Sequence, residues 1–244
     1  MDHDAAARGL ESSLARVRDR IAAACLRAGR PTASVGLVAV SKRIPDPLLL
    51  AACRAGQWTF GENRVQDALP RLDRFPDLLR REGLDPAPLR WHFIGTLQAN
   101  KARKVVGRFS LLHGVDSLDL ARRVDRVAGE LGVRQPFLLQ VNASGEASKH
   151  GLSLHEAAAA AVAAAALPHA ELRGFMAMAR FDAPEPELRA TFADVRRLAA
   201  EASALCGRPL PELSLGMSDD YEIAVEEGAT LVRVGTAVFG PRNA

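Results

Sequence analysis

Short apolar runs alternate with longer amphipathic segments along most of the chain. Apolar runs of about four to eight residues are typical of buried strands, and apolar residues repeating every three or four positions are typical of helices. This pattern predicts an N-terminal helix over roughly residues 5–28, which ends at Gly29 and Pro31. It then predicts eight strands, at residues 35–40, 58–61, 91–95, 110–115, 137–142, 172–178, 213–216 and 231–234.

Helical periodicity follows most of these strands. The helices are expected at residues 47–55, 63–81, 100–106, 118–131, 154–167, 185–206 and 220–227, and the helix after the eighth strand is expected to be short or missing. Strands that alternate with helices indicate a parallel sheet, and eight such units in about 250 residues match a closed barrel. We therefore predict an α/β fold, a (β/α)8 TIM barrel with an extra N-terminal helix. A doubly wound open sheet is the alternative.

No linker rich in Gly, Ser or Pro is long enough to divide the chain. We expect one domain over residues 1–244, in which residues 1–30 form the helix and residues 35–240 the barrel. The formal charge of +3 could suggest nucleic acid. However, the arginines are scattered along predicted helices, and the only dense basic cluster is Lys101 to Lys104, without aromatic partners. A nucleic-acid-binding function therefore ranks last.

The cysteines Cys25, Cys53 and Cys206 are odd in number and far apart. They offer neither a disulfide framework nor metal-ligand spacing, which favours a reducing compartment and no metal. The first residues lack the pattern of a signal peptide, and the Ala-rich run at 157–167 is too short to cross a bilayer. We predict a cytoplasmic monomer without membrane contact.

Unusual residues, most of them polar, cluster where the predicted strands end. The active site of a (β/α)8 barrel lies at this end of the strands, and polar residues are unusual in parallel strands, so a ligand in the barrel mouth is expected. The residues concerned are Lys42, Glu62, Asn63, His92, Gln140, Asn142, Met176, Met178, Ser214, Met217, Ser218, Asp219, Asp220, Arg233, Gly235 and Thr236.

Lys42 follows the first strand and is one of only four lysines, whereas arginine supplies most of the positive charge. Val38, Val40 and Lys42 share the same parity, so the lysine stem can continue an inward-facing line. A lysine can lose its proton and form an imine with an aldehyde. The turn at Gly235 and Thr236 can hold a phosphate through backbone N–H groups. This combination suggests pyridoxal 5'-phosphate (PLP), while a solvated loop lysine is the alternative.

Arg233 shares the face of Gly235 on the eighth strand and can point into the barrel. A guanidinium keeps its proton, so opposite a pyridine nitrogen it would leave the ring a poor electron sink and disfavour transamination. The alternative is an ion pair with Glu62 or Asp219 at the barrel end. His92 and His113 receive no role, because a lone histidine in an apolar strand is usually a core residue.

Several segments carry a specific pattern in order: Ala39-Val-Ser-Lys42, Phe60-Gly-Glu-Asn63, Trp91-His-Phe-Ile-Gly95 with Gln98 and Asn100-Lys101, Leu213-Ser-Leu-Gly-Met-Ser-Asp-Asp220, and Val232-Arg-Val-Gly-Thr236 with Phe239-Gly240. They resemble the pyridoxal phosphate homeostasis proteins, also called the YggS or PROSC family. The resemblance implies a barrel like the N-terminal domain of alanine racemase, with PLP bound as an imine.

The resemblance also implies roles for individual residues. Lys42 would be the Schiff-base lysine and Arg233 would face the pyridine nitrogen. The phosphate would be held by Ser218, Gly235 and Thr236, and the ring would be lined by Asn63 and Met217. Lys149 matches a lysine proposed as an auxiliary contact. Two residues depart from the family pattern: Arg43 stands where a smaller residue is common, and Arg64 where an aromatic is frequent.

The resemblance implies a carrier that buffers and delivers PLP in vitamin B6 homeostasis, with PLP and apo forms of PLP-dependent enzymes as partners. No catalytic residue is predicted. The alternative is a PLP-dependent amino-acid racemase or decarboxylase. Racemisation needs acid–base groups on both faces of the imine. The only tyrosine, Tyr221, falls at the start of a predicted helix, which is a poor place for a catalytic phenol.

Overall fold

A computed structural model of the chain describes residues 3–144, 146 and 150–241. Eight parallel strands pair side by side, and the pairing of β4 with β5 closes them into a barrel in the order β1-β2-β3-β4-β5-β7-β8-β9. The predicted (β/α)8 barrel is thus confirmed. The strands are β1 (Gly36–Val40), β2 (Thr59–Glu62), β3 (Arg90–Thr96), β4 (Leu111–Val115), β5 (Gln135–Asn142), β6 (Leu152–Ser153), β7 (Ala170–Ala177), β8 (Glu212–Ser214) and β9 (Leu231–Val234).

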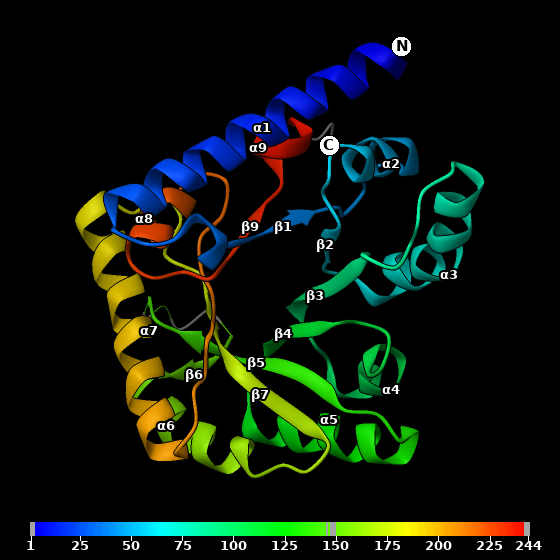
Figure 1. Ribbon diagram of the computed structural model, residues 1–244. Coiled ribbons are helices and arrows are strands. Elements are labelled where there is room, and N and C mark those ends of the chain that lie inside the picture. The colour runs from blue at the N-terminus through cyan, green and yellow to red at the C-terminus, as the bar shows by residue number, and fades with distance from the viewer. Residues whose placement is uncertain (1–2, 145, 147–149, 242–244) are drawn as a thin grey trace.

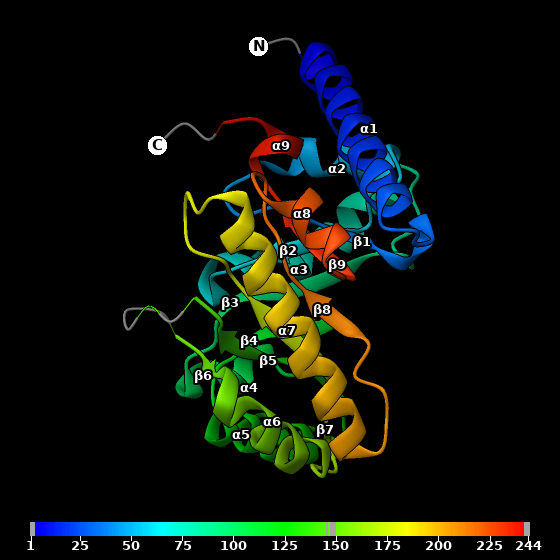
Figure 2. The same cartoon turned by 90° about the vertical axis from the view of Figure 1, so that its left-hand side faces the viewer.

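Helices surround the barrel, and α1 crosses one end of it (Figures 1 and 2). They are α1 (His3–Arg27), α2 (Asp46–Arg54), α3 (Val65–Arg81), α4 (Ala102–Val105), α5 (Leu118–Leu131), α6 (Leu154–Ala165), α7 (Glu185–Cys206), α8 (Tyr221–Glu226) and α9 (Thr236–Phe239), with short 3-10 turns at Thr32–Ser34 and Ala99–Lys101. The helix after the last strand is short, as expected. The two-residue strand β6, which pairs with β5 outside the barrel, was not expected.

The core has two parts. The larger one lies between the strands and the outer helices and includes Phe60, Phe93 and Phe192. A small separate cluster of Leu111, Leu138 and Met176 occupies the barrel interior. An interior filled by side chains is normal for this fold.

Polar side chains share the buried interior with that small cluster. They are His92, His113, Gln140, Ser214 and Arg233, each at most 8% exposed. Burying polar groups is costly unless they are hydrogen-bonded, so their contacts require a specific account.

Neighbouring strands β1 and β9 bring the two ends of the chain together. In their parallel register Val38 is opposite Arg233, and Ala39 is opposite Val234. Residues opposite each other in a sheet point to the same face, so Val38 and Arg233 both face the barrel interior. The loops that follow these two strands, one with Lys42 and one with Gly235, therefore leave the barrel side by side.

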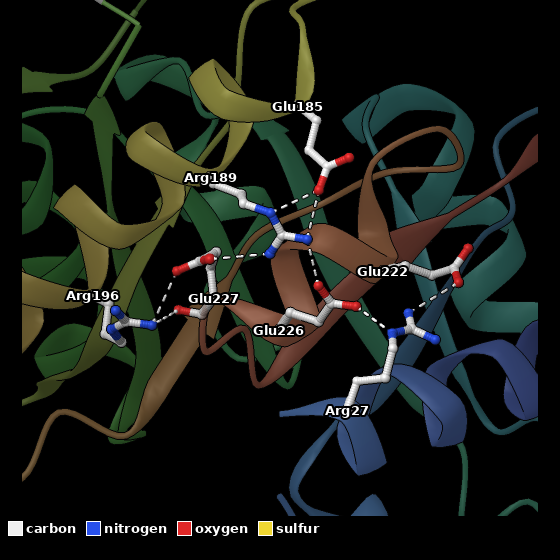
Figure 3. A network of polar contacts seen from close by, with 7 residues as sticks. All are labelled: Arg27, Glu185, Arg189, Arg196, Glu222, Glu226 and Glu227. Carbon is white, nitrogen blue, oxygen red and sulfur yellow. Dashed lines mark hydrogen bonds and ion pairs between the residues drawn. The ribbon is translucent and has the colours of Figure 1, made fainter. Parts of the chain in front are cut away.

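An ion-pair network fastens α1 and α7 to α8 (Figure 3). Arg27 on α1 pairs with Glu222 and Glu226 on α8. Arg189 on α7 pairs with Glu226 and, at 3.2 Å, with Glu227. The network fixes the helix that directly follows the loop of Ser218.

Candidate functional site

The loop after β1 carries Lys42, which is half-buried. Ile44 N donates to Ser41 O at 3.0 Å, so Lys42 and Arg43 form the central pair of a tight turn. Arg43 has a φ of 61°, a left-handed conformation that costs a residue with a side chain about 1 kcal/mol. The turn must therefore be held by contacts from outside it.

Arg71 on α3 supplies those contacts. Its guanidinium donates to Ser41 O at 3.0 Å and to Ile44 O at 2.6 Å, one on each side of the turn. It also pairs with Glu62 at 2.7 Å. Burial raises the pKa of Glu62, and a hydrogen bond from Ser41 Oγ together with the charge of Arg71 opposes that rise. Arg71, itself held by the buried ion pair with Glu62, thus positions the backbone of the Lys42 turn.

Lys42 and Asn63 line one cavity of about 280 Å³, together with Arg43, Arg64 and Asp67. Asn63 lies close to strand β3 because residue 95 is a glycine: a Cβ there would stand 2.4 Å from Asn63 O. The structure therefore brings together two of the residues predicted to contact the ligand.

Ser218 lies opposite the turn that follows β9. Its Oγ accepts hydrogen bonds from Gly235 N at 3.3 Å and Ala237 N at 3.5 Å. Two backbone N–H groups thus converge on one oxygen atom, which is the arrangement that an anionic oxygen requires. The turn formed by Gly235 and Thr236 fits a phosphate group on this ground.

The loop of Ser218 is itself tightly held. Gly216 has a φ of 82°, and a Cβ there would lie 2.7 Å from Ala224 Cβ, so glycine is needed. Asp220 Oδ1 accepts from Met217 N at 2.5 Å. Met217 is 38% exposed and lines a different cavity from Lys42, one of about 490 Å³. The structure does not bring Met217 and Lys42 into a single cavity.

Arg233 is 4% exposed and points into the barrel interior. It donates to Ser214 O and Ser214 Oγ, both at 2.6 Å, and to Ala177 O at 3.0 Å. Among the described residues Arg233 forms no ion pair with Glu62 or Asp219: Glu62 is bound by Arg71, and the hydrogen bonds of the Arg233 guanidinium go to Ser214 and Ala177. Burial lowers the pKa of Arg233 to about 10, against the charge of Asp220, so it remains a cation at neutral pH.

Two histidines extend the contacts of Arg233 through the barrel. His113 Nδ1 lies 2.8 Å from Ser214 Oγ, and His113 Nε2 lies 3.0 Å from His92 Nδ1. Burial lowers the pKa of His92 to about 4. Burial and the charges of His92 and Arg233 hold the pKa of His113 well below its usual value. Both rings are neutral at pH 7.

The donor and acceptor in each hydrogen bond of the series Arg233, Ser214, His113 and His92 can be assigned from Arg233, which can only donate. Ser214 Oγ already accepts from Arg233, so within the described part of the chain its own hydrogen finds its acceptor at His113 Nδ1. His113 then carries its proton on Nε2 and donates to His92 Nδ1. Each donor points away from the guanidinium, as the field of a buried cation favours. The hydrogen-bond network thus assigns the Nε2–H tautomer to both histidines.

Sequence reasoning missed Arg71 and gave no role to His92 and His113. An arginine on an amphipathic helix carries no signal that distinguishes it from a surface arginine. The histidines had one usable signal: each is a polar residue in the middle of a mostly apolar strand, and the two strands are neighbours. Lys149 lies outside the described residues. A further cavity of about 670 Å³, lined by Trp91 and Pro76 among others, contains none of the predicted site residues.

Within the described ranges, no group of three or more His, Cys, Asp or Glu side chains is arranged to hold a metal ion. No helix among the described residues has the length and apolar character needed to cross a membrane. Tyr221 is 1% exposed, and the guanidinium of Arg20 on α1 lies 5.7 Å from the centre of its ring. The phenol is therefore packed under α1.

Comparison with known proteins agrees with this geometry. Residues 13–243 match the family described as alanine racemase, N-terminal domain. The pyridoxal phosphate homeostasis protein of Escherichia coli K12 is 42% identical over 234 residues, covering 95% of this chain and 96% of the relative. The protein of the same name from Pseudomonas aeruginosa is also 42% identical, over 236 residues, covering 96% of both chains.

Solved structures show the same barrel. PipY of Synechococcus elongatus with PLP bound is 41% identical, with a TM-score of 0.78, covering 92% of this chain and 100% of that chain. Alanine racemase from Corynebacterium glutamicum is 18% identical with a TM-score of 0.67, and covers 95% of this chain and 62% of that chain, which shows a shared fold alone. The chain therefore belongs to the pyridoxal phosphate homeostasis protein family, whose barrel is that of the alanine racemase N-terminal domain.

Proposed function

We propose that the protein binds PLP at the barrel mouth as an imine with Lys42, and that it buffers and delivers PLP without turning over a substrate. The observation that carries the proposal is the adjacency of the Lys42 turn and the Gly235 turn at the ends of β1 and β9. A relative that is 41% identical has PLP bound in its structure. When bound, PLP supplies an aldehyde for imine formation and a phosphate for anchoring.

Different residues of the chain would bind the phosphate of PLP, contact its ring and position Lys42. The Gly235 and Thr236 turn with Ser218 would hold the phosphate, because its N–H groups already converge on an oxygen. Asn63 lines the Lys42 cavity and would lie beside the ring, with Met217 on the other side. Arg71 and Glu62 would hold the Lys42 turn in place.

Arg233 supports a carrier over an enzyme. A guanidinium that stays protonated would leave a facing pyridine nitrogen unprotonated, which weakens the ring as an electron sink. The phenol of Tyr221, under α1, gives the alternative racemase or decarboxylase no evident acid on the second face. The single-domain division, the cytoplasmic location, the monomeric state and the receiving apo-enzymes stay predictions.

Borohydride reduction followed by peptide mass spectrometry tests the proposal. The protein incubated with PLP should carry the reduced adduct on Lys42, and Lys42→Ala should lose the visible absorption band. Lys104→Ala is the matched control and should keep it. An adduct found mainly on Lys101 or Lys104 would contradict the proposed site.

A further inference from the structure

The side of the mouth next to Lys42 carries an excess of positive charge. The Lys42 cavity is lined by Lys42, Arg43 and Arg64 and by a single carboxylate, Asp67. Its lining therefore has a charge of +2 when Lys42 is protonated and +1 when it is not. Like charges around one small cavity repel each other, and an anion placed among them removes that repulsion.

Arg43 and Arg64 differ from most arginines of this chain. Most described arginines are held by a carboxylate or a carbonyl, as Arg71 and Arg189 are. The guanidinium groups of Arg43 and Arg64 make no hydrogen bond or ion pair with any part of the chain that the structure describes, and both side chains are exposed. Two unpaired guanidinium groups thus line the same cavity, and both stand where the family pattern has another residue type.

A second cavity of about 330 Å³ adjoins the first. The two share Asn63 and Arg64, and the second is also lined by Lys101, His150 and the neutral polar side chains of Thr96 and Gln98. No Asp or Glu is among its lining residues. Arg64 therefore stands between two cationic cavities, with Lys42 and Arg43 on one side and Lys101 on the other.

The backbone holds Arg43 and Arg64 at fixed places at the edge of the Lys42 cavity, here called the rim. Arg43 is in a left-handed turn whose two flanking carbonyls are bound by Arg71. Arg64 directly precedes α3, a helix of 17 residues. A guanidinium group presents a planar fork of donors that matches a carboxylate, so the chemistry of this rim favours carboxylic acids.

We propose that these two cavities form a second anion site, which takes a small dicarboxylic acid. One carboxylate would lie between Arg43 and Lys42, and the other between Arg64 and Lys101. Asn63, Thr96 and Gln98 would supply neutral hydrogen bonds. This site is separate from the turn of Ser218, Gly235 and Thr236, and it does not depend on PLP being bound.

Succinate titrated calorimetrically into protein purified without PLP, at low ionic strength, tests the proposal. The wild type should bind one succinate, saturating at or below about 10 mM. The double variant Arg43→Gln, Arg64→Gln should bind at least about tenfold more weakly. Monomethyl succinate should also bind more weakly to the wild type, because one carboxylate is blocked.

The matched control is Arg81→Gln, Arg126→Gln. It removes the same charge from two exposed arginines whose side chains also lack a partner among the described residues, away from the mouth. It should bind succinate within about twofold of the wild type. Equal weakening in both double variants would show a general charge effect and would overturn the proposal, as would the absence of saturable binding.

A variant of the phosphate turn separates the two anion sites. Thr236→Ala should leave succinate binding unchanged. If Thr236→Ala weakens succinate while the Arg43, Arg64 double variant does not, the acid occupies the phosphate turn and the proposal is wrong. Single variants at Arg43 and Arg64, checked by near-ultraviolet circular dichroism, keep the test valid if the double variant fails to fold. Since PLP is absent throughout, the result stands whether or not Lys42 binds PLP.

Discussion

Arg71 Nη1 lies 2.7 Å from Glu62 Oε1, and this ion pair is buried beneath the turn that carries Lys42. The side chains are 11% and 2% exposed. The carboxylate end of the pair also accepts a hydrogen bond from Ser41 Oγ at 2.7 Å. One interaction between α3 and β2 therefore fixes the backbone on both sides of the proposed imine lysine.

Replacing Arg71 should damage both stability and binding. Arg71→Ala leaves Glu62 buried without its cation and removes two hydrogen bonds from the Lys42 turn, so the free energy of unfolding should fall by about 3 kcal/mol. Urea unfolding measures this loss. Arg74→Ala is the control, because Arg74 is 52% exposed and pairs with Asp46 at the surface; it should cost less than about 1 kcal/mol. Equal losses in the two variants would contradict this role for Arg71.

Because of the two buried histidines, the free energy of unfolding should decrease as the pH is lowered. Their pKa values are lowered in the folded protein, to about 4 for His92 and well below the ordinary value for His113. Between the ordinary pKa of about 6.5 and the folded pKa, the unfolded chain binds more protons, so stability is lost as pH falls through that range. Each histidine contributes up to about 1.4 kcal/mol per pH unit.

Urea unfolding at pH 7 and pH 5 checks this expectation. The variant His92→Gln should lose less stability between these two pH values than the wild type, because one titrating group is gone. His155→Gln is the control for the substitution itself, since His155 is exposed and the variant should be as stable as the wild type at pH 7. If His92→Gln lost as much stability between pH 7 and pH 5 as the wild type does, His92 would already be protonated in the folded protein.

Ser218→Ala should weaken PLP through its phosphate alone. The variant removes a hydroxyl that contacts the two converging N–H groups, and the loss of a hydrogen bond to a charged group amounts to about 1.5–3 kcal/mol. Titration with PLP followed by absorbance measures the change. Pyridoxal, which lacks the phosphate, should bind Ser218→Ala and the wild type equally well. Equal weakening of both ligands would place the effect of Ser218 outside phosphate binding.

Catalytic turnover should be negligible. Chiral chromatography and product assays with common amino acids should show no racemase, transaminase or decarboxylase activity in the PLP-loaded protein, because Arg233 in its proposed place opposite the ring nitrogen would leave the ring a poor electron sink. Activity on the order of 1 s⁻¹ or more that is lost in Lys42→Ala would contradict the carrier function. A further loss in Tyr221→Phe would mean that the phenol moves out from under α1.

The network in Figure 3 should stabilise the packing of α7 on α8 in a salt-dependent way. Arg189 is 37% exposed and pairs with three glutamates, so Arg189→Ala should cost about 1 kcal/mol at low salt and less in 1 M NaCl. Arg197→Ala, which removes a single pair with Asp194 on a side chain that is 72% exposed, is the control and should have little effect. A loss that does not change with salt would indicate a packing effect instead.

The sequence predicts the barrel because each strand is an apolar run and each outer helix an amphipathic one, and both periods are local properties. Strand β6 was missed because two residues, Leu152 and Ser153, are too few to show a period. The alternative for Arg233, an ion pair with a carboxylate, does not match the hydrogen bonds that it makes in the structure. Charge alone suggested a partner of opposite sign, whereas the register of β8 and β9 supplies Ser214 and a backbone carbonyl.

The placement of Lys42, Asn63 and the Gly235 turn at one mouth follows from strand order, which the alternation predicts. The hydrogen-bond network from Arg233 through Ser214 and His113 to His92 could not be predicted. It depends on which inward-facing residues of four strands lie at the same height in the barrel. The support of Lys42 by Arg71 depends similarly on a contact of helix α3 with the Lys42 loop and with strand β2. Such contacts are set by three-dimensional packing and leave no periodic trace in the sequence.

The pairing of β1 with β9 also sets the order of events when the protein is made. Strand β1 and Lys42, which follows it, are synthesised early, whereas the neighbouring strand β9 begins only at Leu231. Until residues 231–236 have been made, β1 has one open edge and the Gly235 turn does not exist. A ligand that needs both the Lys42 turn and the Gly235 turn can be retained only after that point, so every chain terminated before Leu231 would lack it.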